Sequence, residues 1–429
     1  MESASAERRA AEVEIAKPIG AELRAATDEQ IEAAVAASDP MVLRGLLYQL
    51  TGDEEVAATA TDPVEFLFLE MQFVIDPDQL AVLHRKAIEL LKSLRDGDAD
   101  TVPFGPRERL RASLDLTSGV ELADCEAEMF EASTGVEPFV HGLSWEREPE
   151  PERLGSFSVA VIGAGMGGLN AGVMLKRAGI PFTILEKNPA VAGTWYENRY
   201  PGARVDNPSR AYVHAYGADY DFPGMFTVQA ENERYFNWVA DEFELREEIE
   251  FETEVESIVW HEDDGEWELR ASGPGGERVV RANAVISAVG FLSRPNLPEI
   301  EGMEEFEGDS FHTARWPEGL DLAGKRVAVI GSGCTGYQLV QAIAGQPERT
   351  YLLQRTPSWV FGVEGYLSDF PPELAWLNRN LPFYTNFTRF RLAWLFGPES
   401  LRAAYELDPE FEGEGARSAH NQKLRDDQL

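Results

Sequence analysis

The sequence has 429 residues, of which 38 are Lys or Arg and 75 are Asp or Glu, so that its formal net charge is −37. This length predicts two or three domains, and the hydrophobic fraction of 44% excludes a disordered chain. The large negative charge repels nucleic-acid phosphates and anionic membranes, so we expect neither as a partner. The acidity fits either adaptation to high salt or an ordinary acidic cytosolic protein.

The cysteine content and the hydropathy of the chain limit its class further. Cys125 and Cys334 are the two cysteines, which excludes a disulfide framework and a cysteine-rich metal site. The first residues lack the apolar core of a signal peptide, and no run of about 18 apolar residues predicts a membrane span. We therefore expect a cytoplasmic protein without a metal site.

Residues 20 to about 95 predict a series of helices. Thr27 and Gln30 form a capping-box pattern at the start of one of them. Apolar residues recur at helical spacing at Leu43, Leu46, Leu47, Leu50, Leu83, Ala87, Leu90, Leu91 and Leu94. These stripes are typical of core packing or of a homodimer surface, and the region contains no catalytic motif. A Pro-rich, charged stretch at residues 147–155 predicts a linker after this all-α extension of residues 1–150.

A glycine-rich motif follows the linker. Gly163, Gly165 and Gly168 form a GxGxxG pattern between an apolar strand and an expected helix. Glycines at these positions allow a tight turn, the approach of a pyrophosphate and the packing of the helix on the strand. One GxGxxG is a weak signal, but Glu186 ends the next expected strand, where a carboxylate can bind ribose hydroxyls. The pattern predicts a dinucleotide site, and the plainer alternative is a glycine-rich turn beside a surface glutamate.

A second motif repeats this scheme later in the chain. Gly331, Gly333 and Gly336 follow another apolar strand, but the next strand ends in Arg355 and Thr356 and not in an acidic residue. An arginine can pair with a 2′-phosphate through its charge and its bidentate geometry. We therefore expect NADPH at the second motif, and the alternative is that Arg355 is a solvated surface residue.

Two dinucleotide motifs in one chain are typical of flavoproteins that bind FAD at the first motif and a nicotinamide cofactor at the second. Neither cysteine has a close partner in the sequence, which argues against a dithiol reductase. We expect an α/β protein in which two Rossmann-like domains follow the helical extension. The expected domains are an FAD-binding domain at residues 151–300 and an incomplete NADP-binding domain at residues 301–429.

The segment FEGDSFHTARWP, residues 306–317, lies between the two motifs. Its pattern FxGxxxHxxxWP is matched at Phe306, Gly308, His312, Trp316 and Pro317. This pattern resembles the signature of the Baeyer–Villiger monooxygenase family. The resemblance makes His312 a candidate catalytic residue, although a histidine between domains couples their motion by hydrogen bonding more readily than it transfers protons.

The resemblance extends along most of the chain. Residues 192–206 are similar to the flavin-pocket motif GGxWYxNRYPGxRCD of the family, from which Ala192 and Val205 depart. Residues 287–298 resemble the strand that crosses between the domains of the family. The N-terminal helices are similar to the extension of the 4-hydroxyacetophenone monooxygenase subgroup.

The resemblance implies roles for individual residues in this segment and near it. Asp206 would lie where the flavin meets the nicotinamide, with Arg204 close by. The residues expected to contact FAD are Thr194, Trp195, Tyr196, Glu197, Tyr212 and Val255.

The implied reaction has two steps. NADPH would reduce FAD, and O₂ would then form a peroxyflavin that converts a ketone to an ester or lactone, while the protein positions the cofactors and supplies charge. Flavin monooxygenases that act on nitrogen or sulfur share both glycine motifs, but the Trp316–Pro317 ending favours Baeyer–Villiger chemistry. A truncated, non-catalytic dinucleotide-binding protein is the remaining alternative.

The family stabilises the peroxyflavin with an arginine that is held by an aspartate, and Asp206 matches this aspartate. The arginine lies in a PxGxKR-like segment, and nothing of that form follows residue 360 here. Residues 415–429 resemble the stretch shortly before that segment. We therefore expect either a gene fragment or a truncated product.

The missing segment leads to a prediction about catalysis. We expect the 429-residue chain not to oxygenate ketones, because the cation that stabilises the oxygenating flavin is absent from its sequence. The measurement is product analysis after incubation with FAD, NADPH and a cyclic ketone. Formation of the lactone would contradict the prediction.

Overall fold

The computed structural model describes residues 15–66, 69–143, 145–356, 362–363, 365–397, 407–413 and 416–428. The chain divides into two compact units, of which the first comprises Met1–Val140, Asn207–Met225 and Trp359–Leu429. The second comprises His141–Asp206 and Phe226–Ser358. Residues 1–14, which entered the expectation about a signal peptide, lie outside the described residues. Within the described residues, no helix combines the length and the apolar character that crossing a membrane requires.

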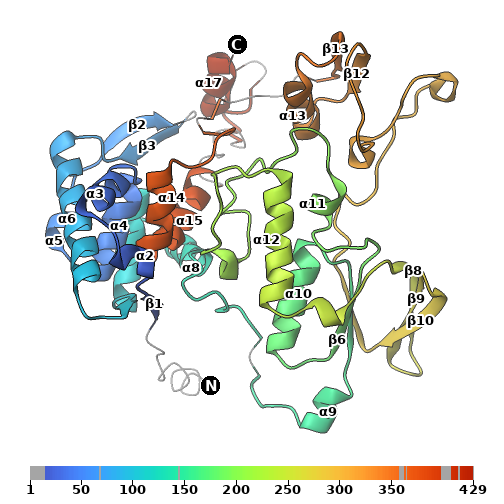
Figure 1. Ribbon diagram of the computed structural model, residues 1–429, viewed down its shortest axis with the longest axis horizontal. Coiled ribbons are helices and arrows are strands. Elements are labelled where there is room, and N and C mark those ends of the chain that lie inside the picture. The colour runs from blue at the N-terminus through green and yellow to red at the C-terminus, as the bar shows by residue number, and fades with distance from the viewer. Residues whose placement is uncertain are drawn as a thin grey trace. The chain divides into compact units, whose positions relative to one another are not determined.

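The first unit is mainly helical, and its helices come from both ends of the chain (Figure 1). Its helices are α2 (Ala21–Arg24), α3 (Asp28–Ala36), α4 (Pro40–Thr51), α5 (Glu54–Ala57), α6 (Pro77–Asp96), η1 (Arg107–Arg109), α7 (Leu110–Ser118), α8 (Asp124–Ser133), η2 (Ala215–Gly217), α14 (Pro372–Asn380), α15 (Tyr384–Leu395) and α17 (Ala419–Gln428). Its strands are β1 (Ala16–Pro18), β2 (Asp62–Phe66), β3 (Leu69–Phe73) and β4 (Thr101–Pro103).

The strands of this unit correct the prediction of an all-α extension. β2 and β3 form an antiparallel hairpin inside the region expected to be helical, and β1 pairs with β4. Met71 on β3 is buried in the core of the unit and attaches the hairpin to it. β1 and β4 have three residues each, which is too short for an alternating pattern to be recognised in the sequence.

The expected start of α3 and the burial of the apolar stripes are confirmed. The Thr27 side chain accepts a hydrogen bond from the Gln30 amide at the start of α3, over 3.2 Å. Of the apolar residues at helical spacing, those that are fully or almost fully buried are Leu43, Leu46, Leu47, Leu83, Ala87 and Leu91. The amphipathic stripes therefore face a core, as their spacing predicts.

The core of the first unit also contains α14 and α15, which are remote from the other helices in sequence. Figure 1 shows these helices, in orange-red, against α3 and α4, in blue, and both pairs are in contact. The Phe383 and Phe104 rings are tilted by 59° with their centroids 4.9 Å apart, and Phe390 meets Phe130 edge-on at 5.2 Å. Such aromatic contacts contribute both apolar burial and specific geometry.

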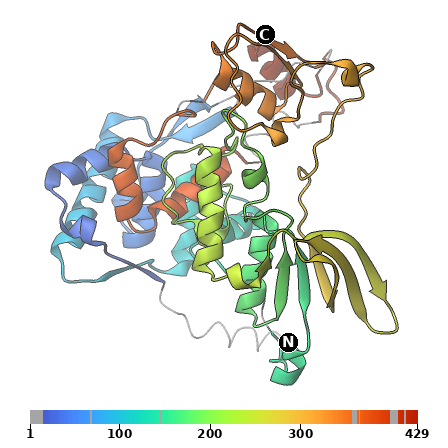
Figure 2. The same ribbon diagram turned by 45° about the vertical axis from the view of Figure 1, so that its right-hand side comes forward.

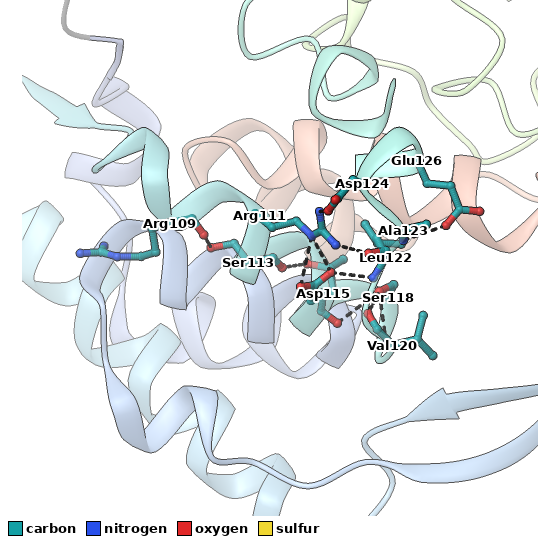
Figure 3. A network of polar contacts seen from close by, with 11 residues as sticks. Arg109, Arg111, Ser113, Asp115, Ser118, Val120, Leu122, Ala123, Asp124 and Glu126 are labelled. Carbon is teal, nitrogen blue, oxygen red and sulfur yellow. Dashed lines mark hydrogen bonds and ion pairs between the residues drawn. The ribbon is translucent and has the colours of Figure 1, made fainter. Parts of the chain in front are cut away.

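A polar network stabilises the turn between α7 and α8 (Figure 3). The Asp115 carboxylate accepts hydrogen bonds from the Leu122 amide at 2.9 Å and from the Arg111 guanidinium at 3.3 Å. Arg111 also pairs with Asp124 at 3.3 Å and donates to the Leu122 carbonyl. Asp115 and Arg111 thus bond the amide and the carbonyl group of Leu122, which lies between the two helices.

The second unit contains a parallel sheet in the order β11-β5-β6-β7. Its strands are β5 (Val159–Ile162), β6 (Phe182–Leu185), β7 (Ile249–Glu250) and β11 (Ala284–Ser287). β5, β6 and β7 follow one another, and β11 returns beside β5, which is the strand order of a dinucleotide-binding half-domain. The helices α9 (Pro151–Gly155), α10 (Met166–Arg177), α11 (Thr194–Glu197), α12 (Gln229–Glu242) and η3 (Arg246–Glu248) belong to this part. α10 packs on the sheet and α12 lies beside α10 (Figure 1).

An antiparallel sheet is inserted before β11. Its strands are β8 (Glu254–His261), β9 (Glu266–Gly273) and β10 (Gly276–Ala282), in the order β10-β9-β8. Figure 2 shows it beside the parallel sheet, and the two sheets share a small core that includes Ala160, Leu185 and Leu269.

The last part of the second unit contains the second glycine motif. It consists of η4 (Met303–Glu305), η5 (Thr313–Arg315), β12 (Arg326–Ile330), α13 (Cys334–Ile343) and β13 (Arg349–Leu353). β12 and β13 are parallel, and α13 connects them along the chain. A core that includes Tyr200, Leu339 and Ile343 joins α13 to the segment before residue 206.

The two units divide the chain differently from the three predicted domains. Residues 207–225 and 359–429 group with the N-terminal helices, and residues 301–358 group with the segment expected to bind FAD. The reason is tertiary packing, because Trp376, Phe387 and Phe390 are buried in the same core as the N-terminal helices. The predicted linker 147–155 contains the short helix α9.

Candidate functional site

The first glycine motif forms a tight turn between β5 and α10. Gly163 has a φ of 99°, a conformation that glycine adopts readily. A Cβ on Gly168 would lie 1.7 Å from the Gly163 carbonyl oxygen, so only glycine lets the helix approach the strand this closely. No side chain caps the start of α10 at Gly165. The turn therefore presents the beginning of a helix without a side-chain acceptor, which is the arrangement that binds phosphate.

Glu186 follows β6 directly and is buried, with 3% of its surface exposed. Its carboxylate accepts hydrogen bonds from the Ala164 amide at 2.6 Å and from the Asn188 amide at 2.8 Å. Glu186 is thus attached to the glycine-rich turn and is not a surface residue. A carboxylate has about four lone-pair sites, so further acceptor capacity is left for a ribose.

The second glycine motif has the same construction. Gly331 has a φ of 108°, and a Cβ on Gly336 would lie 2.2 Å from the Gly331 carbonyl oxygen. Gly333 differs, because nothing lies within 4 Å of the position of its Cβ and its φ of −76° suits any residue. No side chain caps the start of α13. The backbone conformation explains Gly331 and the packing of the helix explains Gly336. Gly333 faces open space, where the phosphate groups of a ligand could approach the chain.

Arg355 and Thr356 lie just beyond β13 and are exposed. The end of this strand is next to the second glycine turn, because the Gly331 amide donates to the Leu353 carbonyl at 2.9 Å. Thr356 is also close to the turn, since the Ser332 hydroxyl donates to its carbonyl oxygen at 3.4 Å. The structure therefore brings both predicted residues to the edge of the second motif.

The segment predicted to line the flavin begins with a loop that crosses the first glycine turn. Ala192 donates its amide to the Ala164 carbonyl at 3.1 Å, and Gly193 approaches Gly165 closely. Ala192 has a φ of 87°, in the region that favours glycine, which the family motif has at this position. The departure at Ala192 therefore costs backbone strain of about 1 kcal/mol. In α11, Trp195 is buried, Tyr196 is half-buried and Thr194 is exposed.

Glu197 is an ion-pair centre within the second unit. Its side chain is 7% exposed and lies 2.9 Å from the Lys187 ammonium and 3.6 Å from the Arg315 guanidinium. Burial by itself raises the pKa of Glu197, but the hydrogen bonds from Lys187 and Asn188 and the charges of Lys187 and Arg315 hold it below its ordinary value. Glu197 therefore connects the end of β6 to the predicted signature segment.

Arg204 and Asp206 lie at the end of a turn that packs on α13. Gln338 of α13 donates to the Asp206 carboxylate at 2.5 Å and to the Arg204 carbonyl at 3.1 Å. Its side-chain oxygen accepts from the Tyr200 hydroxyl at 2.8 Å. The contact joins the segment predicted to line FAD to the helix that begins at the second glycine motif.

The signature segment is ordered by local contacts. The Nδ1 atom of His312 accepts a hydrogen bond from the Ala314 amide at 3.1 Å, so His312 caps the start of η5. The ring of Phe306 lies over Gly308, where a Cβ would be 2.6 Å from it. Trp316 meets Phe311 edge-on at 5.3 Å and packs beside the core around α13. These contacts give His312 a role in ordering the segment, and its expected catalytic role stays a prediction.

Val255 and Tyr212, which were also predicted to contact the cofactor, have surroundings that differ from those of the residues described above. The Val255 side chain packs into the small core between the two sheets, so a cofactor contact there would involve its backbone. Tyr212 belongs to the first unit, whereas the other predicted site residues belong to the second. Within the described residues, no group of His, Cys, Asp or Glu side chains could hold a metal ion.

Comparison with known proteins places the chain in a family. Residues 156–392, more than half of the chain, match the profile of flavin-binding monooxygenase-like proteins. The chain belongs to this family. The match includes both glycine motifs and the signature segment of this flavin-binding monooxygenase-like protein, and it begins after the N-terminal helices.

Individual relatives match part of this monooxygenase-like chain. A Baeyer–Villiger monooxygenase of Streptomyces coelicolor is 42% identical over 203 residues, which are 47% of this chain and 38% of the relative. The acetone monooxygenase (methyl acetate-forming) of Gordonia sp. is 40% identical over 272 residues, 59% of this chain and 50% of the relative. The crystal structure of cyclohexanone monooxygenase from Rhodococcus sp. Phi1 bound to NADP⁺ is similar with a TM-score of 0.47, 38% identity and coverage of 51% of this chain and 42% of that one. The chain spans half or less of the length of these three proteins.

The sequence did not reveal several residues that contact the predicted site residues. Gln338, Lys187 and Arg315 occupy no defined position of a motif, and the partners of Gln338 and Arg315 are more than 100 residues away. Gln338 is on a face of α13 that could be located from the glycine motif, but no sequence pattern shows that this face meets Asp206.

Glu197 generates a prediction about stability and pH. Its folded-state pKa is lowered, so its ion pairs stabilise the fold above the ordinary pKa range of Glu, about 4.3, and this contribution is lost as the pH falls through the folded-state value. We expect Glu197→Gln to lower the melting temperature at pH 7, with a difference from wild type that shrinks below about pH 4.

The control is Glu242→Gln, which removes an exposed carboxylate of α12 in the same unit. We expect it to change the melting temperature little at any pH. Thermal melts monitored by circular dichroism across this pH range make the comparison. A constant difference between Glu197→Gln and wild type down to pH 3 would contradict the prediction.

Proposed function

We propose that this chain binds FAD at the first glycine motif and NADPH at the second, as part of a Baeyer–Villiger monooxygenase that oxidises a ketone to an ester or lactone. The observation that carries the proposal is the repeated construction of the two turns. In each, the first glycine has a positive φ and the third packs on the carbonyl of the first. The exposed start of a helix beside each turn fits a dinucleotide pyrophosphate.

The first turn fits FAD through three features. The amides at the start of α10 can hold the pyrophosphate charge, and no side chain competes for them. Glu186 is held beside the turn by two amides, in the position from which a carboxylate binds ribose hydroxyls. α11 follows with Trp195 and Tyr196, which the family resemblance assigns to the flavin pocket.

The second turn fits a 2′-phosphorylated nicotinamide cofactor. Arg355 is exposed at the end of the strand, where an acidic residue would repel a 2′-phosphate, and Thr356 is tied to the turn through Ser332. When bound, NADPH would supply hydride, and FAD would supply the chemistry of oxygen activation. The protein would contribute binding at the two turns and orientation of the cofactors through α11 and the turn at residues 200–206.

The proposal of a ketone substrate is supported by the signature segment and by the similar proteins. The Trp316–Pro317 ending matches the Baeyer–Villiger pattern, and the Gordonia relative is named for the conversion of acetone to methyl acetate. We further propose membership of the 4-hydroxyacetophenone monooxygenase subgroup and a homodimer through the N-terminal helices, in a cytoplasmic protein. Support for the subgroup and the dimer comes from the mainly helical region from α2 to α8, which precedes the part of the chain that matches the family.

The glycine turns provide a test in which folding and binding separate. We expect Gly333→Ala to melt like wild type, since its Cβ meets nothing within 4 Å, but to bind NADP⁺ at least about tenfold more weakly because the methyl group keeps the pyrophosphate away. We expect Gly336→Ala to lower the melting temperature, since its Cβ would overlap the Gly331 carbonyl. Calorimetric titration and thermal melts provide the two readouts.

The matched control for this test is Gly275→Ala in the turn between β9 and β10, where a Cβ also has nothing within 4 Å. It should change neither the melting temperature nor the affinity for NADP⁺. If Gly333→Ala bound NADP⁺ as tightly as the wild-type protein does, the second turn would not be the dinucleotide site, and the proposed NADPH site would be refuted.

Arg355 gives a test of cofactor choice. We expect wild-type protein loaded with FAD to be reduced faster by NADPH than by NADH, because the guanidinium pairs with the 2′-phosphate. Arg355→Gln should weaken NADPH binding by about 10- to 100-fold, which corresponds to a hydrogen bond to a charged group, and leave NADH unchanged. Both the reduction rates and the NADPH affinity are measured under anaerobic conditions, from the loss of oxidised-flavin absorbance at increasing concentrations of each cofactor.

The control is Arg349→Gln, which removes an exposed arginine at the opposite end of β13. It produces the same change of charge and should leave the preference for NADPH intact. Equal rates with the two cofactors in the wild-type protein would refute the assignment of NADPH.

A further inference from the structure

The turn at residues 200–206 is attached to one face of α13. A Cβ on Gly202 would lie 2.7 Å from both the Gln338 carbonyl oxygen and the Ala342 side chain, so the backbone of the turn touches the helix. Gln338 and Ala342 are four residues apart and share one face of the helix with Cys334. The turn and the helix therefore form a close backbone contact that requires glycine at 202, where φ is 83°.

Gln338 provides the polar part of this contact. The side chain is 7% exposed, and both ends of its amide are used. Its oxygen accepts from the Tyr200 hydroxyl at 2.8 Å and the Arg204 amide at 3.4 Å. Its nitrogen donates to the Arg204 carbonyl at 3.1 Å and the Asp206 carboxylate at 2.5 Å. A single buried amide thus orders the beginning and the end of the turn.

The Asp206 carboxylate lies close to the first turn of α13. It accepts a hydrogen bond from Cys334, the first residue of the helix, and this contact raises the pKa of the Cys334 thiol. The partial positive charge at the start of a helix attracts a carboxylate as it attracts a phosphate. An unrestrained Asp206 could therefore turn onto the amides at which the pyrophosphate is expected, and Gln338 holds it to one side.

We propose that Gln338 is a positioning residue for the nicotinamide site, which fixes the Asp206 carboxylate beside the start of α13 and prevents it from competing with the pyrophosphate. The inference rests on the proposed binding of NADP(H) at the second turn. The inference assigns a positioning role to the side-chain amide of Gln338, which is not part of either glycine motif. It also explains why the turn with the predicted catalytic Asp206 is attached to the nicotinamide half of the unit.

The test replaces one atom of the amide and varies the pH. Gln338→Glu keeps the shape of the side chain but sets a carboxylate against Asp206, and two carboxylates at this distance share one proton. The other titratable groups around Gln338 are Tyr200 and Arg204 of the turn and Cys334 of α13, whose ordinary pKa values lie above about 8. Between pH 5.5 and pH 8 the shared proton of the new pair is therefore the main titration expected at this contact.

We expect the affinity of Gln338→Glu for NADP⁺ to fall about tenfold more between pH 5.5 and pH 8 than that of Gln341→Glu. Gln341 is exposed on the same helix, so its variant carries the same added charge without the contact. The melting temperature of Gln338→Glu should fall relative to that of Gln341→Glu over the same range. Calorimetry with NADP⁺ and thermal melts at each pH measure the two effects.

Two further variants keep the test decisive. In Gln338→Glu with Asp206→Asn, the new amide can donate to the new carboxylate, so the additional pH dependence should disappear. Gln338→Met keeps the length of the side chain without polar atoms, and it should weaken NADP⁺ binding by a similar factor at every pH. This variant replaces Gln338→Glu if the latter does not fold at pH 8.

The possible outcomes separate the inference from the proposed function. If the melts change as expected but NADP⁺ affinity follows the control, Gln338 has a structural role only and the inference is overturned. If Gln338→Glu follows Gln341→Glu in both readouts, the contact itself is refuted. If the wild-type chain binds no NADP⁺, the proposed function fails, and the positioning role fails with it.

Discussion

The close approach of a helix to the glycine that follows the preceding strand is the constraint on which the second unit depends. In both motifs the third glycine packs on the carbonyl of the first, at distances that a side chain would not allow. This contact fixes the start of α10 against β5 and the start of α13 against β12. The orientation of the amides at each helix start, and thus any affinity for a pyrophosphate, follows from this packing.

Around these turns, buried polar side chains connect segments that the sequence separates. Glu186 ties the end of β6 to the first turn, Glu197 joins Lys187 to Arg315 of the signature segment, and Gln338 attaches the turn at residues 200–206 to α13. Glu186 and Gln338 are buried and the Glu197 side chain is 7% exposed, so loss of these hydrogen bonds would leave buried polar atoms without partners. The predicted flavin and nicotinamide segments are therefore held together by hydrogen bonds as well as by the core around Tyr200.

The first unit is built on a different principle, a core shared by helices from distant parts of the chain. α15 carries Arg391, which is 1% exposed and donates to the backbone carbonyl groups of Thr117 and Ser118 at the end of α7. Its guanidinium also lies over the ring of Phe73 at 4.8 Å. Burying this cation lowers its pKa through loss of solvation, and the carbonyl and ring contacts offset part of that cost.

The sequence by itself determined the local structure of this protein. The glycine spacing predicted both strand–turn–helix units, the apolar periodicity predicted α4 and α6, and the capping pattern predicted the start of α3, because these features depend on neighbours within about four residues. Only the tertiary structure decided that α14 and α15 join the N-terminal helices, that β2 and β3 interrupt the helical region, and that Tyr212 lies in a different unit from the other predicted site residues. The partners of Glu197 and Gln338 were likewise decided by tertiary structure. Hydrogen bonds and apolar contacts between distant segments have no fixed spacing, so no pattern in the sequence could predict them.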